Sequence, residues 1–271
     1  MRWVNVRPSR RNSVLLGALP LLLVVVAYLF ASAARHAANP SDKILPTPAA
    51  MATAMHSLLV DADPLSGRLI FWADTLASLE RLGLGLGICT LSALLVGMVL
   101  GILPAARASF GALVTTVAVI PPIALLPVLF IVFGLGEAAK VALIVIGVTP
   151  FMIRDLADHV AALPQEQLIK AQTLGASSWQ LALRVALPQA LPRLIAGLRL
   201  SLGPAWVYLI SAEAIASDIG LGYRIFLVRR YLSMDIIIPY VAWISLLAIL
   251  MDVALAQLSR RAFVWAHQTS R

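Results

Sequence analysis

The feature of this sequence that most limits its fold is a series of apolar stretches, each long enough to cross a lipid bilayer. A transmembrane helix needs about 20 mostly apolar residues. Hydrophobic residues make up 61% of the 271-residue chain and charged residues only 13%, against about 25% charged in soluble domains. The sequence therefore predicts an all-α integral membrane protein. We expect six membrane-spanning segments, at residues 14–32, 83–103, 111–133, 138–153, 194–214 and 236–258.

Basic residues at both ends of the chain predict its orientation. Because Lys and Arg concentrate in cytoplasmic loops, we expect residues 1–13 and 259–271 to lie in the cytoplasm. The net charge of +8 does not indicate nucleic-acid binding, since the basic residues form no stripe along one face. The terminal basic residues are Arg2, Arg7, Arg10, Arg11, Arg260, Arg261 and Arg271.

The first apolar segment could be a cleavable signal peptide or a retained anchor. Basic residues precede it, and Ala31-Ser32-Ala33 follows it in the style of a cleavage site. Its apolar run, residues 14–30, spans 17 residues, which is longer than the 7–15 of a signal peptide. We therefore expect an anchor over 14–32, followed by an extracytoplasmic loop over 33–82.

The end of that loop, RLIFWADTLASLERL, has apolar residues at helical spacing. Four apolar residues recur at this spacing, and the charged residues of the stretch occupy other positions: the apolar residues are Leu69, Trp72, Leu76 and Leu79, and the charged ones are Asp74, Glu80 and Arg81. This pattern is typical of an amphipathic helix that lies along a membrane surface. An early start of the second membrane helix explains the pattern equally well.

Glycines in the second segment indicate close helix packing. The pairs Gly83/Gly87 and Gly97/Gly101 have the spacing that lets two helix backbones approach. The string GLGLG is no dinucleotide-binding loop, because that motif requires glycine where Ile88 stands and a soluble strand before it.

Three prolines, Pro121, Pro122 and Pro127, fall within the third segment. Each removes a backbone donor and disturbs the preceding turn. A broken helix persists at membrane depth where protein or a water-filled cavity surrounds it. The prolines are therefore candidates for lining a pathway, although a purely structural kink accounts for them as well.

A polar stretch, IKAQTLGASSWQLALRVALPQALP, separates the fourth and fifth segments. Pro164 suits the start of a helix, and Gly175 suits its left-handed end. Ser177 and Gln180 form the pattern of a capping box for a second short helix, which Pro188 and Pro192 would bound. The sequence predicts a helix, a glycine turn and a helix on the cytoplasmic side. Its apolar face packs either on its own bundle or in a groove of a partner.

This stretch resembles the cytoplasmic loop signature of bacterial ABC importer permeases, E-A-A-x-x-x-G followed after nine residues by I-x-L-P. Gly175 occupies the glycine, and residues 185–188 (VALP) stand in place of I-x-L-P. The triad departs from the pattern, because Ile169-Lys170-Ala171 replaces Glu-Ala-Ala and lacks its acidic contact. Other stretches, such as residues 197–223, are similar to the nitrate/sulfonate/taurine branch of that family, and the likeness extends over residues 70–265.

The resemblance implies a six-span permease of the type I, MetI-like fold in the bacterial inner membrane, with a core domain over 83–258. It also implies a second permease copy as a homodimer, two copies of an ATPase subunit and a solute-binding protein. The loop 164–188 would be the coupling helix that the ATPase holds, in a system importing a small anion such as a sulfonate, taurine or nitrate. Its coupling residues would be Lys170, Ala171, Leu174, Gly175, Ala176, Trp179, Leu183, Leu187 and Pro188.

The sequence indicates no catalytic, metal or cofactor site on this chain. Its lysines, Lys43, Lys140 and Lys170, do not follow the glycine pattern of a phosphate loop, so we expect ATP and Mg²⁺ on the partner ATPase. The four histidines form no cluster with ligand spacing. The single cysteine, Cys89, lies in an apolar segment and is expected to be a small core residue.

Two acidic residues in apolar segments are further candidates for the pathway. Glu213, near the outer end of the fifth segment, either reaches water, pairs with Arg224, or acts as a gate or contact for the binding protein. Asp252 lies deep in the sixth segment, and we expect it to face the bundle interior in a polar pair or in the pathway. Burying a charged carboxylate at the bilayer centre costs about 2.5–3.5 kcal/mol. Arg199 is expected to extend to the cytoplasmic interface.

Two questions about transport stay open at this point. The outer loop carries Arg224, Arg229 and Arg230, which could attract an anion or dock the binding protein or lipid headgroups. The alternative function is an ion-coupled secondary transporter. That class places acidic residues at the membrane midplane beside broken helices, in two related halves, and this sequence has no internal repeat.

Overall fold

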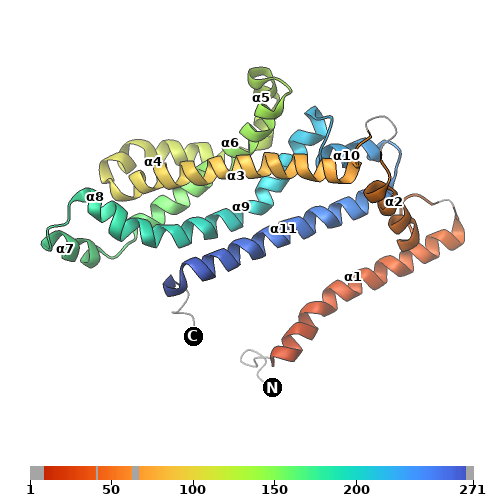
Figure 1. The fold of residues 1–271 in the computed structure, drawn as a ribbon, viewed down its shortest axis with the longest axis horizontal. Helices are drawn as coiled ribbons and strands as arrows, with labels where there is room; N and C mark the ends of the chain where they lie inside the picture. Colours follow the sequence, from red (N-terminus) through yellow and green to blue (C-terminus); the bar gives the residue numbers. More distant parts are fainter. Residues whose placement is uncertain (1–8, 41, 63–66, 267–271) are drawn as a thin grey trace.

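The structure of the protein is a computed structural model that describes residues 9–40, 42–62 and 67–266. The basic residues Arg2, Arg7 and Arg271 lie outside the described residues. Within the described ranges all regular secondary structure is helical, as the sequence predicts. The long helices run roughly along one axis, with α7 and α8 at one end of the molecule and α10 at the other (Figure 1).

The first part of the chain forms two helices joined by a loop. Helix α1 spans Arg10–Ala38 and begins where the backbone N–H of Asn12 donates to the side chain of Ser9. It lies to one side of the other long helices (Figure 1), and most of its apolar side chains are exposed. Helix α2, Pro48–Val60, packs against α11 and α3. Tyr28 fixes the loop to α1 by donating from its hydroxyl to Pro46 O at 2.7 Å.

Helix α3 is continuous over Ile70–Ile102, so the alternative of an early helix start is correct and a separate surface helix is wrong. The polar and apolar faces of this part of α3 lie on opposite sides of the helix. Asp74 and Arg81 are buried in the bundle, while Trp72 and Leu76 are exposed on its outside. The physical reason is that the polar side chains find charged partners inside, whereas the apolar side chains can face lipid.

The predicted third segment is broken at its prolines. Helix α4, Pro104–Val119, is followed by the 3₁₀ turn η1, Pro122–Leu125, and by α5, Leu126–Phe133. The two arms are bent by 86°. Pro121 and Pro122 lack the amide hydrogens that would continue the ladder of α4, and the chain turns where they occur.

The rest of the chain forms the core and the element over residues 164–188. The elements are α6 (Glu137–Ala161), α7 (Gln165–Thr173), α8 (Ser178–Gln180), the π-helical turn η2 (Leu181–Ala186), α9 (Leu187–Ala216), α10 (Leu221–Arg229) and α11 (Met234–Ala262).

Pro188 and Pro192 do not bound the second short helix, so that prediction is wrong. Helices α8, η2 and α9 form one continuous helix from Ser178 to Ala216. In η2 the backbone N–H of Leu187 donates to Ala182 O, five residues back. A π turn is wider than an α turn, and it lets the helix pass the ring of Pro188 without breaking.

A row of small residues on α3 brings that helix against α6. The row consists of Gly85, Cys89, Ala93, Gly97 and Gly101, one every four residues, and Cys89 is fully buried as predicted. A Cβ atom on Gly101 would lie 2.5 Å from Val160 Cβ, closer than any real contact. The prediction for the second glycine pair is confirmed. The first pair, Gly83 and Gly87, has no heavy atom within 4 Å of its Cβ positions among the described residues, so it makes no close helix contact within this chain.

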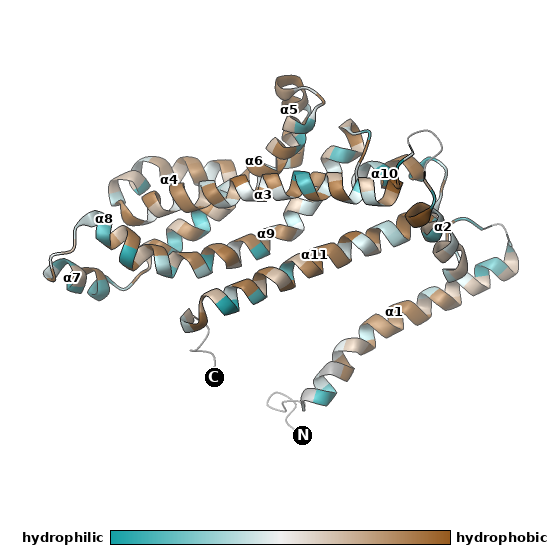
Figure 2. Cartoon of the chain, viewed as in Figure 1, coloured by the Kyte–Doolittle hydropathy of each residue, from teal (hydrophilic) through white to brown (hydrophobic). Residues whose placement is uncertain are grey.

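Four continuous helices of the described residues are long and apolar enough to cross a membrane, namely α1, α3, the helix from Ser178 to Ala216, and α11, and the bent pair would make a fifth. Apolar residues cover them along their length (Figure 2). Helix α6 carries charges near both ends, including Lys140 and Arg154, yet it packs in the centre of the bundle against α3 and α9. The boundaries of the membrane segments stay predictions.

Candidate functional site

The element over residues 164–188 has the predicted helix, glycine turn and second helix, although the second helix continues into α9. Gly175 adopts φ +82°, a left-handed conformation that glycine alone reaches without strain. Its N–H donates to Gln172 O at 2.9 Å, and Ala176 N–H donates to Ala171 O at 3.0 Å. The capping box is also present: Gln180 N–H donates to Ser177 Oγ, and Ser177 N–H donates to the side chain of Gln180. These local predictions are confirmed.

Large apolar side chains project from both sides of the glycine turn. Leu174 is 88% exposed and Trp179 is 71% exposed, and Ile169 and Leu183 are exposed as well. Leu181, in contrast, is buried and anchors the element to the bundle. An apolar surface at the tip of a polar element is free to bind a partner.

The other predicted coupling residues have varied surroundings. Lys170, Gly175 and Pro188 are exposed, whereas Ala171, Ala176 and Leu187 are half-buried. Gln189 Nε2 donates to Gln167 Oε1 at 3.1 Å and so ties α9 to α7. The role of these residues in binding an ATPase stays a prediction.

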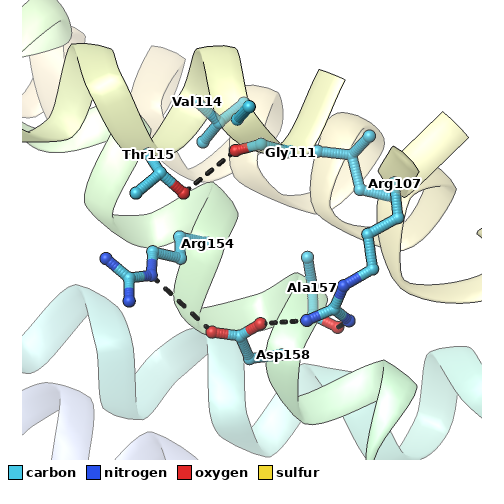
Figure 3. A pocket seen from close by; sticks show the side chains of 9 residues that line it. Arg107, Gly111, Val114, Thr115, Arg154, Ala157 and Asp158 are labelled. Atoms are coloured by element: carbon cyan, nitrogen blue, oxygen red, sulfur yellow. Dashed lines mark hydrogen bonds and ion pairs between the residues drawn. The ribbon is translucent and has the colours of Figure 1, made fainter. Parts of the chain in front are cut away.

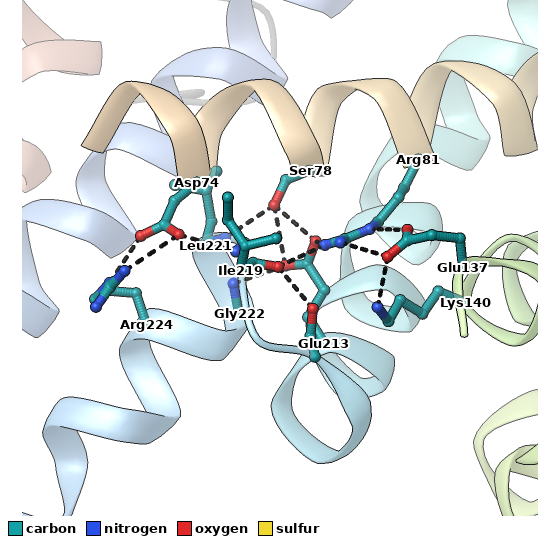
Figure 4. Close-up of polar contacts among 12 residues, drawn as sticks. Asp74, Ser78, Arg81, Glu137, Lys140, Glu213, Ile219, Leu221, Gly222 and Arg224 are labelled. Carbon is teal, nitrogen blue, oxygen red and sulfur yellow. Dashed lines mark hydrogen bonds and ion pairs between the residues drawn. The ribbon is translucent and has the colours of Figure 1, made fainter. Parts of the chain in front are cut away.

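Glu213 lies fully buried at the opposite end of the bundle, within a polar network that joins α3, α6, α9 and α10 (Figure 4). Its carboxylate accepts from Arg81 Nη1 at 2.7 Å, from Ser78 Oγ at 2.8 Å and from Gly222 N–H at 2.8 Å. The predicted pairing with Arg224 is therefore wrong, as is an exposed carboxylate. Arg81 is closer because it lies two turns along the same face of α3 as Asp74, which takes Arg224 instead.

Asp74 forms the second centre of this network. Arg224 Nε donates to its Oδ2 at 2.8 Å, and the backbone N–H of Gly220 donates to its Oδ1 at 2.9 Å. Gly220 has φ +136°, and a Cβ there would lie 2.6 Å from the carboxyl carbon of Glu213. The loop between α9 and α10 is thus closed tightly over the two buried carboxylates.

Glu137, the first residue of α6, extends the network to the surface. Arg81 Nη2 donates to its Oε1 at 2.8 Å, and Lys140 Nζ does so at 2.8 Å. These cations, Arg81 foremost, lower the pKa of Glu137 to about 2. The sequence analysis missed the roles of Asp74, Ser78 and Arg81. Their spacing of four and three residues on one helix face is the signal that could have revealed them.

Asp252 does not face the bundle interior, so that prediction is wrong. Its side chain is 42% exposed and accepts two hydrogen bonds from Arg199, at 2.8 and 2.9 Å. The alternative of a polar pair is correct, and Arg199 uses its guanidinium in this pair between α9 and α11. Both side chains are partly exposed, at 36% and 42%, so the pair is not a buried one.

The proline break packs against α6 at a glycine. A Cβ on Gly147 would lie 3.0 Å from Pro122 Cγ and 2.4 Å from the ring of Tyr208. Pro121 and Pro127 are exposed, and in α4, whose 16 residues are all described, no side chain is buried. A part for these prolines, or for Glu213 and Asp252, in a pathway stays a prediction. Across the described residues, no group of three or more His, Cys, Asp or Glu side chains could hold a metal ion.

Comparison with known proteins relates this arrangement to membrane transport. A sequence profile of the family described as "Binding-protein-dependent transport system inner membrane component" matches residues 93–264. The taurine transport system permease protein TauC of Escherichia coli is 34% identical over 194 residues, which are 72% of this chain and 70% of TauC. A putative ABC transporter permease protein of Methanocaldococcus jannaschii is 28% identical over 97% of this chain and 96% of its own length.

Two further matches concern an anion transporter and a solved fold. The bicarbonate transport system permease protein CmpB of Synechococcus elongatus is 31% identical over 70% of this chain and 69% of its own. A chain of the MetNI methionine ABC transporter, in an inward-facing conformation, superposes with a TM-score of 0.62 at 21% identity, covering 71% of this chain and 95% of that one. At this identity the likeness shows the fold, which is MetI-like as the sequence analysis expected.

Proposed function

Because the chain belongs to the family of inner-membrane components of binding-protein-dependent transport systems, we propose that it forms the pathway by which an ABC importer takes up a small anion. It is a permease subunit, and the ion-coupled alternative is set aside. Relatives are named for the transport of taurine, aliphatic sulfonates and bicarbonate. Each of these solutes carries a compact oxyanion, which supports the same class of solute for this chain.

The family also implies the partners. An importer that depends on a binding protein needs that protein outside and an ATPase inside. We propose two ATPase copies, and two copies of this chain as a homodimer. ATP and Mg²⁺ would bind the ATPase, and this chain would make and break no covalent bond. The start of α1 and the end of α11 both point toward the end of the molecule that carries α7 and α8 (Figure 1), which supports cytoplasmic termini.

The observation that carries the coupling proposal is the exposed apolar tip around Gly175. Leu174 and Trp179 project from it and cover no part of this chain's own core. A groove on the ATPase would bury them. Because α8, η2 and α9 form one continuous helix, a displacement of the tip moves α9 directly. Helix α9 ends beside Glu213, so the motion reaches the polar network around Glu213 and Asp74, which we call the outer network.

Co-purification with the ATPase subunit tests this role. Trp179→Ala should weaken the complex at least tenfold, because buried aromatic anchors contribute about 2 kcal/mol or more to an interface, and should leave the melting temperature of the free permease unchanged. Gly175→Val should also abolish the complex, since valine strongly disfavours φ +82°.

The matched control is Trp72→Ala, which removes another exposed tryptophan at the far end of the bundle. It should leave ATPase binding intact. Full ATPase binding by the Trp179→Ala and Gly175→Val variants would contradict the coupling role of this element.

A further inference from the structure

A cavity of about 380 Å³ lies between α4 and α6, near the end of the bundle that carries the coupling element (Figure 3). Arg107 from the start of α4 and Arg154 from α6 line it, together with Asp158 one turn further along α6. We call it the Arg107–Arg154 pocket. It is separate from the coupling tip and from the outer network, at the opposite end of the bundle from Glu213.

The pocket has one more positive than negative charge. Arg107 Nη2 contacts Asp158 Oδ1, and its Nη1 donates to Ala157 O at 3.4 Å. Arg154 approaches the same carboxylate from the other side, with Nε 3.8 Å from Oδ2, which is too long for a hydrogen bond. Two guanidinium groups therefore share one carboxylate, and the side chain of Arg154, which lines the cavity, is more than half exposed.

The wall opposite Arg154 is built from small residues. Gly111 and Ala112 leave space along α4, and the hydroxyl of Thr115 donates to Gly111 O at 2.9 Å. The cavity volume falls at the lower end of the range for small-molecule sites, about 300–1,000 Å³. It would admit a sulfonate or bicarbonate, and guanidinium groups bind such oxyanions in a forked geometry.

We propose that the Arg107–Arg154 pocket binds a small, singly charged oxyanion on its way to the cytoplasm. As a station on the pathway this rests on the proposed function. Asp158 also limits the affinity of the site, because it competes with the anion for both arginines. A transport site has to bind weakly enough to release its ion, and a competing carboxylate keeps the affinity low.

A cysteine introduced into the pocket reports the electrostatic potential there through its rates of reaction with charged thiol reagents. Thr115→Cys places a thiol on its wall, and the native Cys89 is fully buried. The full-length variant is placed in phosphatidylcholine nanodiscs and treated with an anionic or a cationic methanethiosulfonate reagent. With each rate divided by that reagent's rate with a free thiol in solution, we expect the anionic reagent to react about tenfold faster, as charged clefts concentrate counter-ions. Methanesulfonate should slow that reaction as its concentration rises.

Two further substitutions should act in opposite directions. Arg154→Gln should lower the ratio of anionic to cationic rates and remove protection by methanesulfonate, and Arg154→Lys should restore much of the ratio. Asp158→Asn should raise the ratio and strengthen protection, since it frees both arginines. A purely structural ion pair predicts instead that both changes weaken the fold in the same way.

The neighbouring pair Arg193–Asp155 supplies the matched control. Arg193 Nε donates to Asp155 Oδ2 at 2.9 Å, and Asp155 also belongs to α6, but neither residue lines the pocket. Arg193→Gln should leave the rate ratio and the protection unchanged. An equal effect of Arg193→Gln and Arg154→Gln would overturn the proposal, and so would a thiol that neither reagent reaches.

A lipid headgroup is the other source of a singly charged oxyanion. Protection by phosphatidylglycerol in the nanodisc, with none from methanesulfonate, would make this a lipid site and overturn the proposal. The assay uses the permease without its ATPase. Full ATPase binding by the Trp179→Ala and Gly175→Val variants would therefore contradict the proposed coupling role and leave this result standing, and the reverse holds as well.

Discussion

Replacing Glu213 with glutamine tests whether the polar network around this residue stabilises the bundle. In the native chain three donors, Ser78 Oγ, Arg81 Nη1 and Gly222 N–H, point at the carboxylate within 2.7–2.8 Å. A glutamine amide would direct its own NH₂ group at one of these donors and leave Arg81 without its buried counter-charge. Removing one partner from a buried ion pair costs about 3–5 kcal/mol.

The expected loss of folding stability can be measured as a fall in the melting temperature. For a chain of this size about 1 kcal/mol lowers the midpoint by roughly 2–4 °C, so Glu213→Gln should lower it by about 6–20 °C. Intrinsic tryptophan fluorescence during heating in detergent measures this change. Glu137→Gln is the matched control, because Arg81 also holds that carboxylate, but it is 62% exposed. Losing the charge of Glu137 should lower the folding stability by less than about 1 kcal/mol.

A double substitution separates the stability effect of the ion pair from the effects of its two residues taken singly. Arg81→Gln with Glu213→Gln leaves no unpaired charge inside, so its melting temperature should fall by less than the sum of the two single changes. Two results would refute the reasoning. One is a midpoint for Glu213→Gln within about 2 °C of the native chain, estimated from the same scaling. The other is an equal loss for Glu137→Gln.

Three further changes have expected outcomes. Gly101→Leu overpacks α3 against α6 and should destabilise the fold by about 1–3 kcal/mol in thermal unfolding, whereas Gly83→Leu, on the open face, should not. The pKa of Glu137 is lowered to about 2, below its value in the unfolded chain, about 4.3. Its contribution to folding stability is therefore fully present above about pH 4.3 and is lost only as the pH falls toward 2. Glu137→Gln should leave the pH profile of uptake unchanged between pH 5 and 8. Asp252→Arg should reduce uptake, and adding Arg199→Asp should restore it, since the swap rebuilds their pair; no rescue would show that the pair is not required.

Local features of this protein follow from the sequence because neighbouring residues determine them. The glycine turn at Gly175 and the capping box at Ser177 depend on backbone conformation and on side chains three residues away. The break at Pro121 and Pro122 follows from the missing amide hydrogens. The spacing around Gly175 also sufficed to identify the family, which the profile match over residues 93–264 confirms.

The continuity of the element over residues 164–188 with α9 could not be predicted without the structure. Proline at positions 188 and 192 predicts an interruption, because a proline ring clashes with the carbonyl four residues before it. The π turn at Leu181–Ala186 relieves that conflict, and both Leu181 and Ala186 are buried in the bundle. Local rules for proline could not reveal that packing.

The sequence alone determined which residues share a helix face, since the helical period places Asp74, Ser78 and Arg81 together. The tertiary structure alone decided that this face turns inward and that Arg81 meets Glu213, 132 positions along the chain. In water, apolar residues turn toward the core. In a membrane the surrounding lipid is as apolar as the core, so hydrophobicity does not orient a helix, and the pairing of its few charges does.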